Sequence, residues 1–121
     1  MSNREIPQVV KNLQKARARM AMHGMARYQF INDNMVCMMG AIFMGEPKRF
    51  TYNNHTPEEQ DMMKMVYRSL FNSKIPKNAT IMHSDIACWN NHAARNTQDC
   101  LDVFDRAIEA AMQEHGILAT V

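Results

Sequence analysis

The side chains with the clearest potential for chemistry lie in one polar segment, WNNHAARN, at residues 89–96. It holds the only tryptophan, Trp89, then Asn90, Asn91 and the cation Arg95. A helix N-cap is expected directly after the arginine, and the free amides of a helix N-terminus attract anions. An indole face beside such a helix end suits a planar ligand that carries phosphate. A structural role is the alternative, in which the tryptophan anchors the core and Arg95 pairs with an acid.

A second candidate is the row Lys11, Lys15 and Arg19, which recurs at every fourth position. Residues 1–27 carry six basic side chains and one acid, whereas residues 97–115 carry five acids and one base. This asymmetry favours attraction between the two ends, within one chain or between chains. The row is either a solvated helix face or an electropositive strip for an anion.

Catalytic and metal-binding patterns are weak. The five histidines show no His-x-x-x-His spacing, and a zinc set of His83, Cys88 and His92 lacks an evident fourth ligand. Cys37 is the alternative nucleophile, but apolar neighbours raise the pKa of a thiol and make it inert. We therefore expect no catalytic residue, no metal and no cofactor.

Length and composition restrict the class of protein. A chain of 121 residues, 46% of them apolar, fits one globular domain over residues 1–121. No apolar run approaches the ~18 residues of a membrane span, and the N-terminus lacks the apolar segment of a signal peptide. Three cysteines without Cys-x-x-Cys spacing fit a reducing compartment. These features predict a cytoplasmic protein without a membrane partner.

Helical patterns dominate the chain. The expected helices cover residues 4–23, 35–44, 56–72, 85–89 and 97–115, with irregular loops at 25–34 and 45–55. Ser2 or Asn3 should cap the first helix, and Ser84 should cap the short fourth one. The segment 35–44 is apolar on all sides, so it should be a buried helix, with a buried strand as the alternative. We expect an all-α fold, a compact single-domain bundle of about five helices.

Methionine is unusually frequent, with thirteen residues in the chain. Because its side chain is flexible and polarisable, methionine fills irregular gaps in a core and also suits adaptable surfaces. The composition therefore predicts either a loosely specified core or a methionine-rich pocket or interface.

Two blocks of the sequence resemble those of a known family. Cys37-Met38-Met39-Gly40-Ala41 resembles a Cys-x-x-Gly-Ala block, and residues 89–96 resemble Trp-Asn-Asp-x-Pro-Gly-Arg-Thr. Together they resemble a small family of unknown function that is carried by bacteria and their phages. Asn91 stands where that family has aspartate, and without this carboxylate the turn loses a general base or hard-metal ligand. The resemblance implies no established activity, and this departure favours a structural role for the motif.

The expected function is a non-catalytic cytoplasmic binding module, a phage accessory protein that sequesters a small anionic, nucleotide-like ligand. The candidate ligand-binding residues are Trp89, Asn90, Asn91, Arg95, Lys15 and Arg19. One alternative is an inhibitor that docks on a host protein through a methionine-rich face, and another is an enzyme that depends on Cys37 or a histidine. We also expect a homo-oligomer. Duplex DNA is a poor fit, because the net charge is only +2 and the last helix is acidic.

Overall fold

The computed structural model describes residues 6–27, 31–32, 35–43 and 55–117. These residues form the helices α1 (Gln8–His23), α2 (Met38–Ile42), α3 (Pro57–Phe71), α4 (Ala79–His92) and α5 (Thr97–Glu114). Two short strands, β1 (Ile31–Asn32) and β2 (Met35–Val36), pair antiparallel just ahead of α2. The predicted all-α bundle of five helices is confirmed, with this small strand pair added.

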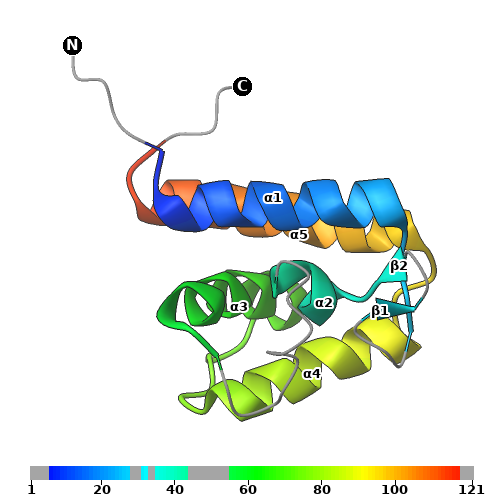
Figure 1. Ribbon diagram of the computed structural model, residues 1–121. Helices are drawn as coiled ribbons and strands as arrows, with labels where there is room; N and C mark the ends of the chain where they lie inside the picture. Colours follow the sequence, from blue (N-terminus) through cyan, green and yellow to red (C-terminus); the bar gives the residue numbers. More distant parts are fainter. Residues whose placement is uncertain (1–5, 28–30, 33–34, 44–54, 118–121) are drawn as a thin grey trace.

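The helices form two layers. α1 and α5 lie side by side in opposite directions, and α2, α3 and α4 make up the second layer (Figure 1). An ion pair between Arg17 and Asp105 joins the two outer helices. The backbone N–H of Met25 donates to Thr97 Oγ1 at 3.1 Å, which ties the chain after α1 to the start of α5.

Methionine is mainly a core residue in this fold. Buried methionines among the described residues are Met20, Met38, Met39, Met62, Met63, Met65 and Met82. They pack with other apolar side chains of α1 and α5 such as Val10, Leu13 and Val103. Met22 is the contrasting case, because it is 79% exposed on α1. The described methionines therefore fill the irregular space between helices rather than form a broad surface.

The helices α3 and α5 begin with side-chain caps. Thr56 Oγ1 accepts from the N–H of Glu59 at 3.1 Å, and the Glu59 carboxylate accepts from the N–H of Thr56 at 2.9 Å. Asn96 Oδ1 accepts from the N–H of Asp99 at 3.0 Å at the start of α5. Gly116, with a φ of 75°, lies just beyond the end of α5 and adopts the left-handed conformation that terminates helices.

The fourth helix was predicted at 85–89, which is helical, but its predicted length and its Ser84 cap are wrong. α4 begins at Ala79, where Asn78 Oδ1 accepts from the N–H of Thr80 at 2.8 Å, and Ser84 lies inside the helix. The helix was hard to recognise because its buried side includes the polar residues His83 and Asn90, which break the apolar periodicity.

The other differences are smaller. α1 begins at Gln8 after Pro7, and the expected caps Ser2 and Asn3 lie outside the described residues. The segment predicted as one helix over 35–44 divides into β2 and α2, so each of the two alternatives holds for part of it. Of the loop predicted at 45–55, only His55 is described.

Among the described residues, no helix is both long enough and apolar enough to cross a membrane.

Candidate anion-binding site

Asn90 is a buried structural residue. Its side chain is fully buried, and its Oδ1 accepts from the N–H of Met38 at 3.1 Å. Its Nδ2 donates to the carbonyl of Ala26 at 2.8 Å. A primary amide offers both an acceptor and donors, so one side chain can satisfy two backbone groups of opposite kind. Asn90 thus holds the start of α2 and the turn after α1 against α4.

Arg27 caps the C-terminal end of α4, the same end at which Asn90 lies. Its Nη1 donates to the carbonyl of Asn91 at 2.8 Å, and its Nη2 donates to the carbonyl of Ala94 at 2.6 Å. Carbonyls at a helix C-terminus lack intrahelical partners and carry partial negative charge, so a guanidinium is a favourable partner. The sequence alone gives no sign of this role, because no local pattern links Arg27 to a helix end more than 60 positions away.

Arg95 is exposed and paired with Asp99. Its Nε lies 3.1 Å from Asp99 Oδ2, and its Nη2 lies 3.3 Å from Asp99 Oδ1. This hydrogen-bonded pair raises the pKa of Arg95 and lowers the pKa of Asp99. The N–H of Arg95 also donates to the same carboxylate. The protein therefore supplies its own carboxylate at the N-terminus of α5, where an anionic ligand was expected.

Trp89 is partly buried against the core. It is half-buried and packs against the core from the last turn of α4. Asn91 beside it is also half-buried, and its Oδ1 accepts from Asn90 Nδ2 at 3.3 Å. The tryptophan therefore packs against the core, and the remainder of its side chain is accessible to solvent at the end of the helix.

Lys15 and Arg19 line an open hollow on α1. Its volume is about 350 Å³, and its described lining consists of Lys15, Ala18, Arg19, Met22 and His23, none of them acidic. Arg19 is half-buried, and burial lowers the pKa of its guanidinium. One of its N–H groups lies 3.5 Å from the carbonyl of Ala41, on α2. The hollow therefore gathers three basic side chains on one helix.

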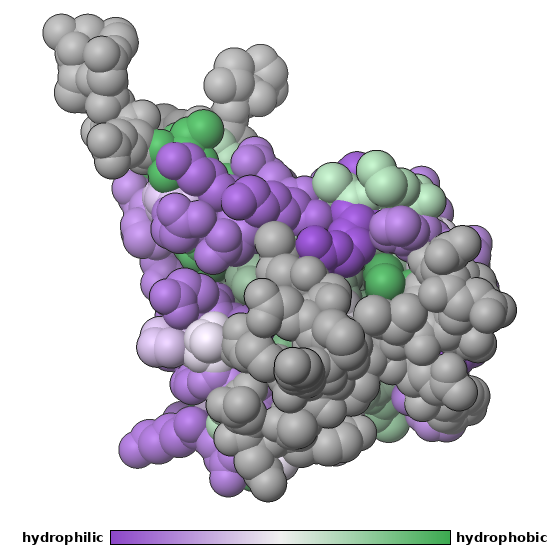
Figure 2. Space-filling model, in the orientation of Figure 1, coloured by the Kyte–Doolittle hydropathy of each residue, from purple (hydrophilic) through white to green (hydrophobic). Residues whose placement is uncertain are grey.

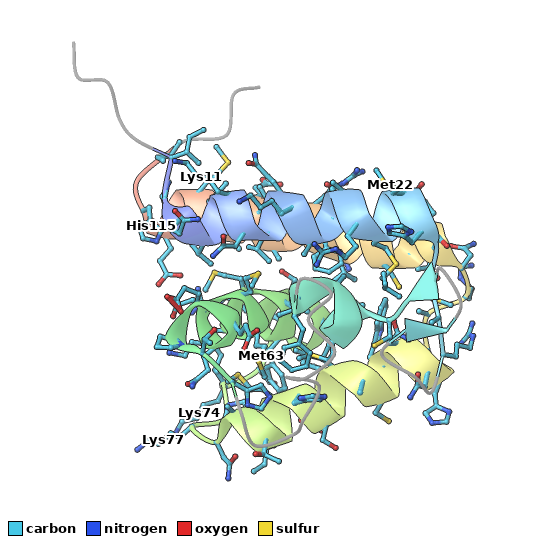
Figure 3. All side chains as sticks on the ribbon, in the orientation of Figure 1. Lys11, Met22, Met63, Lys74, Lys77 and His115 are labelled. Atoms are coloured by element: carbon cyan, nitrogen blue, oxygen red, sulfur yellow. The ribbon has the colours of Figure 1, made fainter. Side chains whose placement is uncertain are left out.

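The surface of α1 fits this description. Figure 2 shows mainly hydrophilic side chains along the middle of the helix, with hydrophobic side chains near both ends and the paler patch at the C-terminal end. Met22 lies at that end, whereas Lys11 lies toward the N-terminal end (Figure 3).

The six predicted ligand-binding residues fall into two groups. Lys15 and Arg19 share the α1 hollow, and none of the residues from the 89–96 segment lines it. A second hollow of about 270 Å³ has a lining of mixed charge, namely Val9, Asp61, Lys64, Met65, Glu114 and His115. The α1 hollow is therefore the better candidate for an anion.

Two histidines that lie far apart in the sequence, His55 and His83, are in contact near the start of α3. His55 Nε2 and His83 Nδ1 are 2.9 Å apart, and the ring of Phe43 stacks on His55 with centroids 5.9 Å apart. His83 is fully buried, and burial together with the charge of His55 lowers its pKa to about 4. His83 is therefore neutral at pH 7. No spacing in the sequence could have revealed the pair.

The cysteines and the remaining metal candidates do not converge. Burial raises the pKa of the Cys37 thiol and, with the charge of Asp99, raises the pKa of Cys100 to about 12. His83 is buried, whereas Cys88 and His92 are exposed on other sides of α4. Within the described part of the chain, no three His, Cys, Asp or Glu side chains cluster as metal ligands would.

A family model described as a family of unknown function, DUF6197, matches residues 5–110. Because this match covers most of the chain, the protein belongs to that family. No match was found among curated proteins or among solved structures. The predicted membership of an uncharacterised family is confirmed.

Proposed function

We propose that this DUF6197 protein is a non-catalytic binding module that takes up a small phosphate-bearing anion, with nucleotides as the preferred class. The observation that carries the proposal is the α1 hollow, where Lys15, Arg19 and His23 come together without a described acidic neighbour in the lining. Ammonium and guanidinium groups bind phosphate through charge-assisted hydrogen bonds, and the guanidinium supplies several donors.

The apolar residues of the hollow support a nucleotide over a bare inorganic anion. Ala18 and Met22 are exposed between the basic side chains. A thioether makes favourable contacts with aromatic rings, so Met22 offers a surface for a planar base while the cations hold the phosphate. The proposed setting is the cytoplasm, with the role of a phage accessory protein that the family resemblance implies.

In this proposal the 89–96 segment stabilises the fold and does not bind the ligand. Asn90 is committed to backbone groups of Met38 and Ala26, and Arg95 is paired with Asp99. The proposal therefore moves the ligand from this turn to α1. Of the four candidate residues in the segment, Trp89 and Asn91 are half-buried, and the proposal gives them no part in ligand binding.

The buried cysteine thiols support the proposal that the protein is not an enzyme. The pKa values of Cys37 and Cys100 are raised by burial, which keeps both as thiols at neutral pH. A thiol is a far weaker nucleophile than a thiolate. The proposal therefore assigns these cysteines to the core.

An inhibitor that docks on another protein is the second candidate function. The exposed large apolar side chains among the described residues are Ile6, Met22 and Ile81. They lie on separate parts of the chain, and most described methionines are buried, so a broad methionine-rich face gains little support. The exposure of Met22 is the observation that favours this second function, and Met22 lines the same α1 hollow.

Self-association is proposed as well. α1 and α5 attract each other within one chain through Arg17 and Asp105, while Asp102 and Glu109 remain exposed on α5. These acids and the exposed lysines of α1 are complementary between two copies. Light scattering at micromolar concentration should therefore give a mass above the monomer at low salt, and a monomer would contradict this part.

Titration calorimetry with mono-, di- and cyclic nucleotides at low salt tests the ligand proposal. Lys15→Gln and Arg19→Gln should each weaken binding about tenfold, since a charged hydrogen bond contributes about 1.5–3 kcal/mol. Binding should also weaken as salt screens the charges. Lys77→Gln is the matched control, because it removes the same charge from the distant turn between α3 and α4 (Figure 3). The absence of heat with every nucleotide would favour the inhibitor instead.

A further inference from the structure

The basic side chains of α1 extend beyond the hollow. Lys11, Lys15, Arg19 and His23 recur at every fourth position and are called the basic row below. Successive members are about 6 Å apart along the helix axis, so the row spans about 18 Å. Lys11, Lys15 and His23 are exposed and Arg19 is half-buried. The row is therefore longer than one mononucleotide needs.

The charges of the row are not used for ion pairs within the described chain. Among the described residues, no acidic side chain forms an ion pair with any of its four members. Other arginines behave differently: Arg17 pairs with Asp105, Arg68 with Glu114 and Arg95 with Asp99. Three arginines of the described chain are thus paired with carboxylates, whereas the basic row on α1 has no described acidic partner.

We propose that the basic row binds consecutive phosphates of a single-stranded nucleic acid. This inference rests on the proposed anion site and extends it from one phosphate-bearing group to a chain of them. The spacing along the row is similar to the distance between neighbouring phosphates of an extended strand, so each side chain meets about one phosphate. Sequence-independent binding of single strands commonly uses such a positive track for the backbone.

The neighbouring helix favours a narrow ligand. α5 runs along α1 and exposes Asp102, Asp105 and Glu109. Packed helices are about 8–10 Å apart, so a ligand wider than one helix would bring its phosphates close to these acids. A single strand fits along α1 alone, whereas the second strand of a duplex would meet like charge.

Met22 supplies a contact for a base. It is 79% exposed and lies between Arg19 and His23 in the sequence, at the C-terminal end of the row. Its thioether is suited to an aromatic ring in contact with it. The row therefore combines backbone contacts along its length with one apolar base contact at its end.

Fluorescence anisotropy with labelled oligothymidylates at low salt tests this inference on the full chain. Affinity should rise from the mononucleotide through the dinucleotide to the tetranucleotide, because each added phosphate meets another member of the row. The slope of log K against log salt should approach −0.7 per phosphate contact, or about −3 for the tetranucleotide.

Lys11→Gln separates the chain of phosphates from the anion site itself. This variant should weaken tetranucleotide binding several-fold and reduce the salt slope by about 0.7, with mononucleotide binding unchanged. Lys74→Gln, at the distant turn that Figure 3 shows, should change neither. Both lysines are exposed, so neither variant should affect folding.

The outcomes are distinct. A tetranucleotide that binds no tighter than a mononucleotide, or that ignores Lys11→Gln, overturns the inference but leaves the anion site. Absence of binding to either ligand overturns both proposals. Tighter binding of a duplex overturns the preference for a single strand, and equal binding of linear inorganic polyphosphate overturns the assignment to nucleic acid.

Discussion

Asn90 accepts a hydrogen bond from the backbone N–H of Met38 at 3.1 Å, although 52 residues separate the two in the sequence. The same amide donates to the carbonyl of Ala26. The most polar motif of the chain therefore contributes a central residue to the fold. For function, this means that the candidate ligand-binding residues are polar side chains that do not already hold the fold together.

Asn90→Ala should lower the free energy of unfolding by roughly 2–6 kcal/mol. The substitution leaves a buried N–H and a buried carbonyl without partners, at about 1–3 kcal/mol each. Urea denaturation measures the change, and Asn12→Ala, which removes only a surface hydrogen bond with Gln8, should cost far less. Equal midpoints for the two variants would show that the Asn90 contacts contribute little.

Arg27→Gln should destabilise the protein by about 1.5–3 kcal/mol, because charged hydrogen bonds to the end of α4 are lost. The comparison variant is Arg106→Gln, which removes the same charge from an exposed position on α5. Thermal unfolding of both variants gives the result. A melting temperature for Arg27→Gln that matches the control would mean that solvent satisfies these carbonyls equally well.

Stability should decrease as the pH falls from about 6.5 to about 4. His83 has a pKa of about 4 in the folded protein, below the ordinary value of 6.5, because it is buried and lies beside His55. In this window the unfolded chain binds a proton that the folded chain excludes, so the stabilisation present above pH 6.5 is lost. The loss should be on the order of 2–3 kcal/mol. Urea midpoints across this range measure it, and NMR of the His83 ring checks it directly. Titration of that ring near 6.5 would contradict the account.

Trp89→Ala should cost about 2 kcal/mol, less than the ~3–5 kcal/mol of a fully buried large side chain. The reason is that Trp89 is half-buried at the end of α4. Because it is the only tryptophan, its fluorescence reports the environment directly. Quenching by iodide should be intermediate between that of free tryptophan and that of a protected indole, and complete protection would disprove partial exposure.

Local chemistry made much of the fold predictable. The Thr56 and Asn96 caps follow from short-range patterns, and their helices begin where these patterns predict. α4 was misjudged because His83 and Asn90 occupy buried positions that an apolar pattern would fill. Burial of such polar groups depends on partners distant in the sequence, which periodicity cannot indicate.

The candidate site was only partly predictable, for the same reason. The spacing of Lys15 and Arg19 places both on one side of a helix, and the structure keeps them together in one hollow. Arg95 carries the same charge, but its pairing with Asp99 depends on how the chain turns into α5. Residue type thus indicates which groups can bind an anion, and tertiary structure decides which are already engaged.

The most direct test of the account is the location of the nucleotide site. Two-dimensional NMR of ¹⁵N-labelled protein, titrated with a nucleoside diphosphate at low salt, reports which backbone amides change. The account predicts saturable shifts that centre on Lys15, Arg19 and His23 and that are lost in Arg19→Gln but kept in Lys77→Gln. Shifts centred on residues 89–96 instead, or no saturable shifts at all, would contradict it.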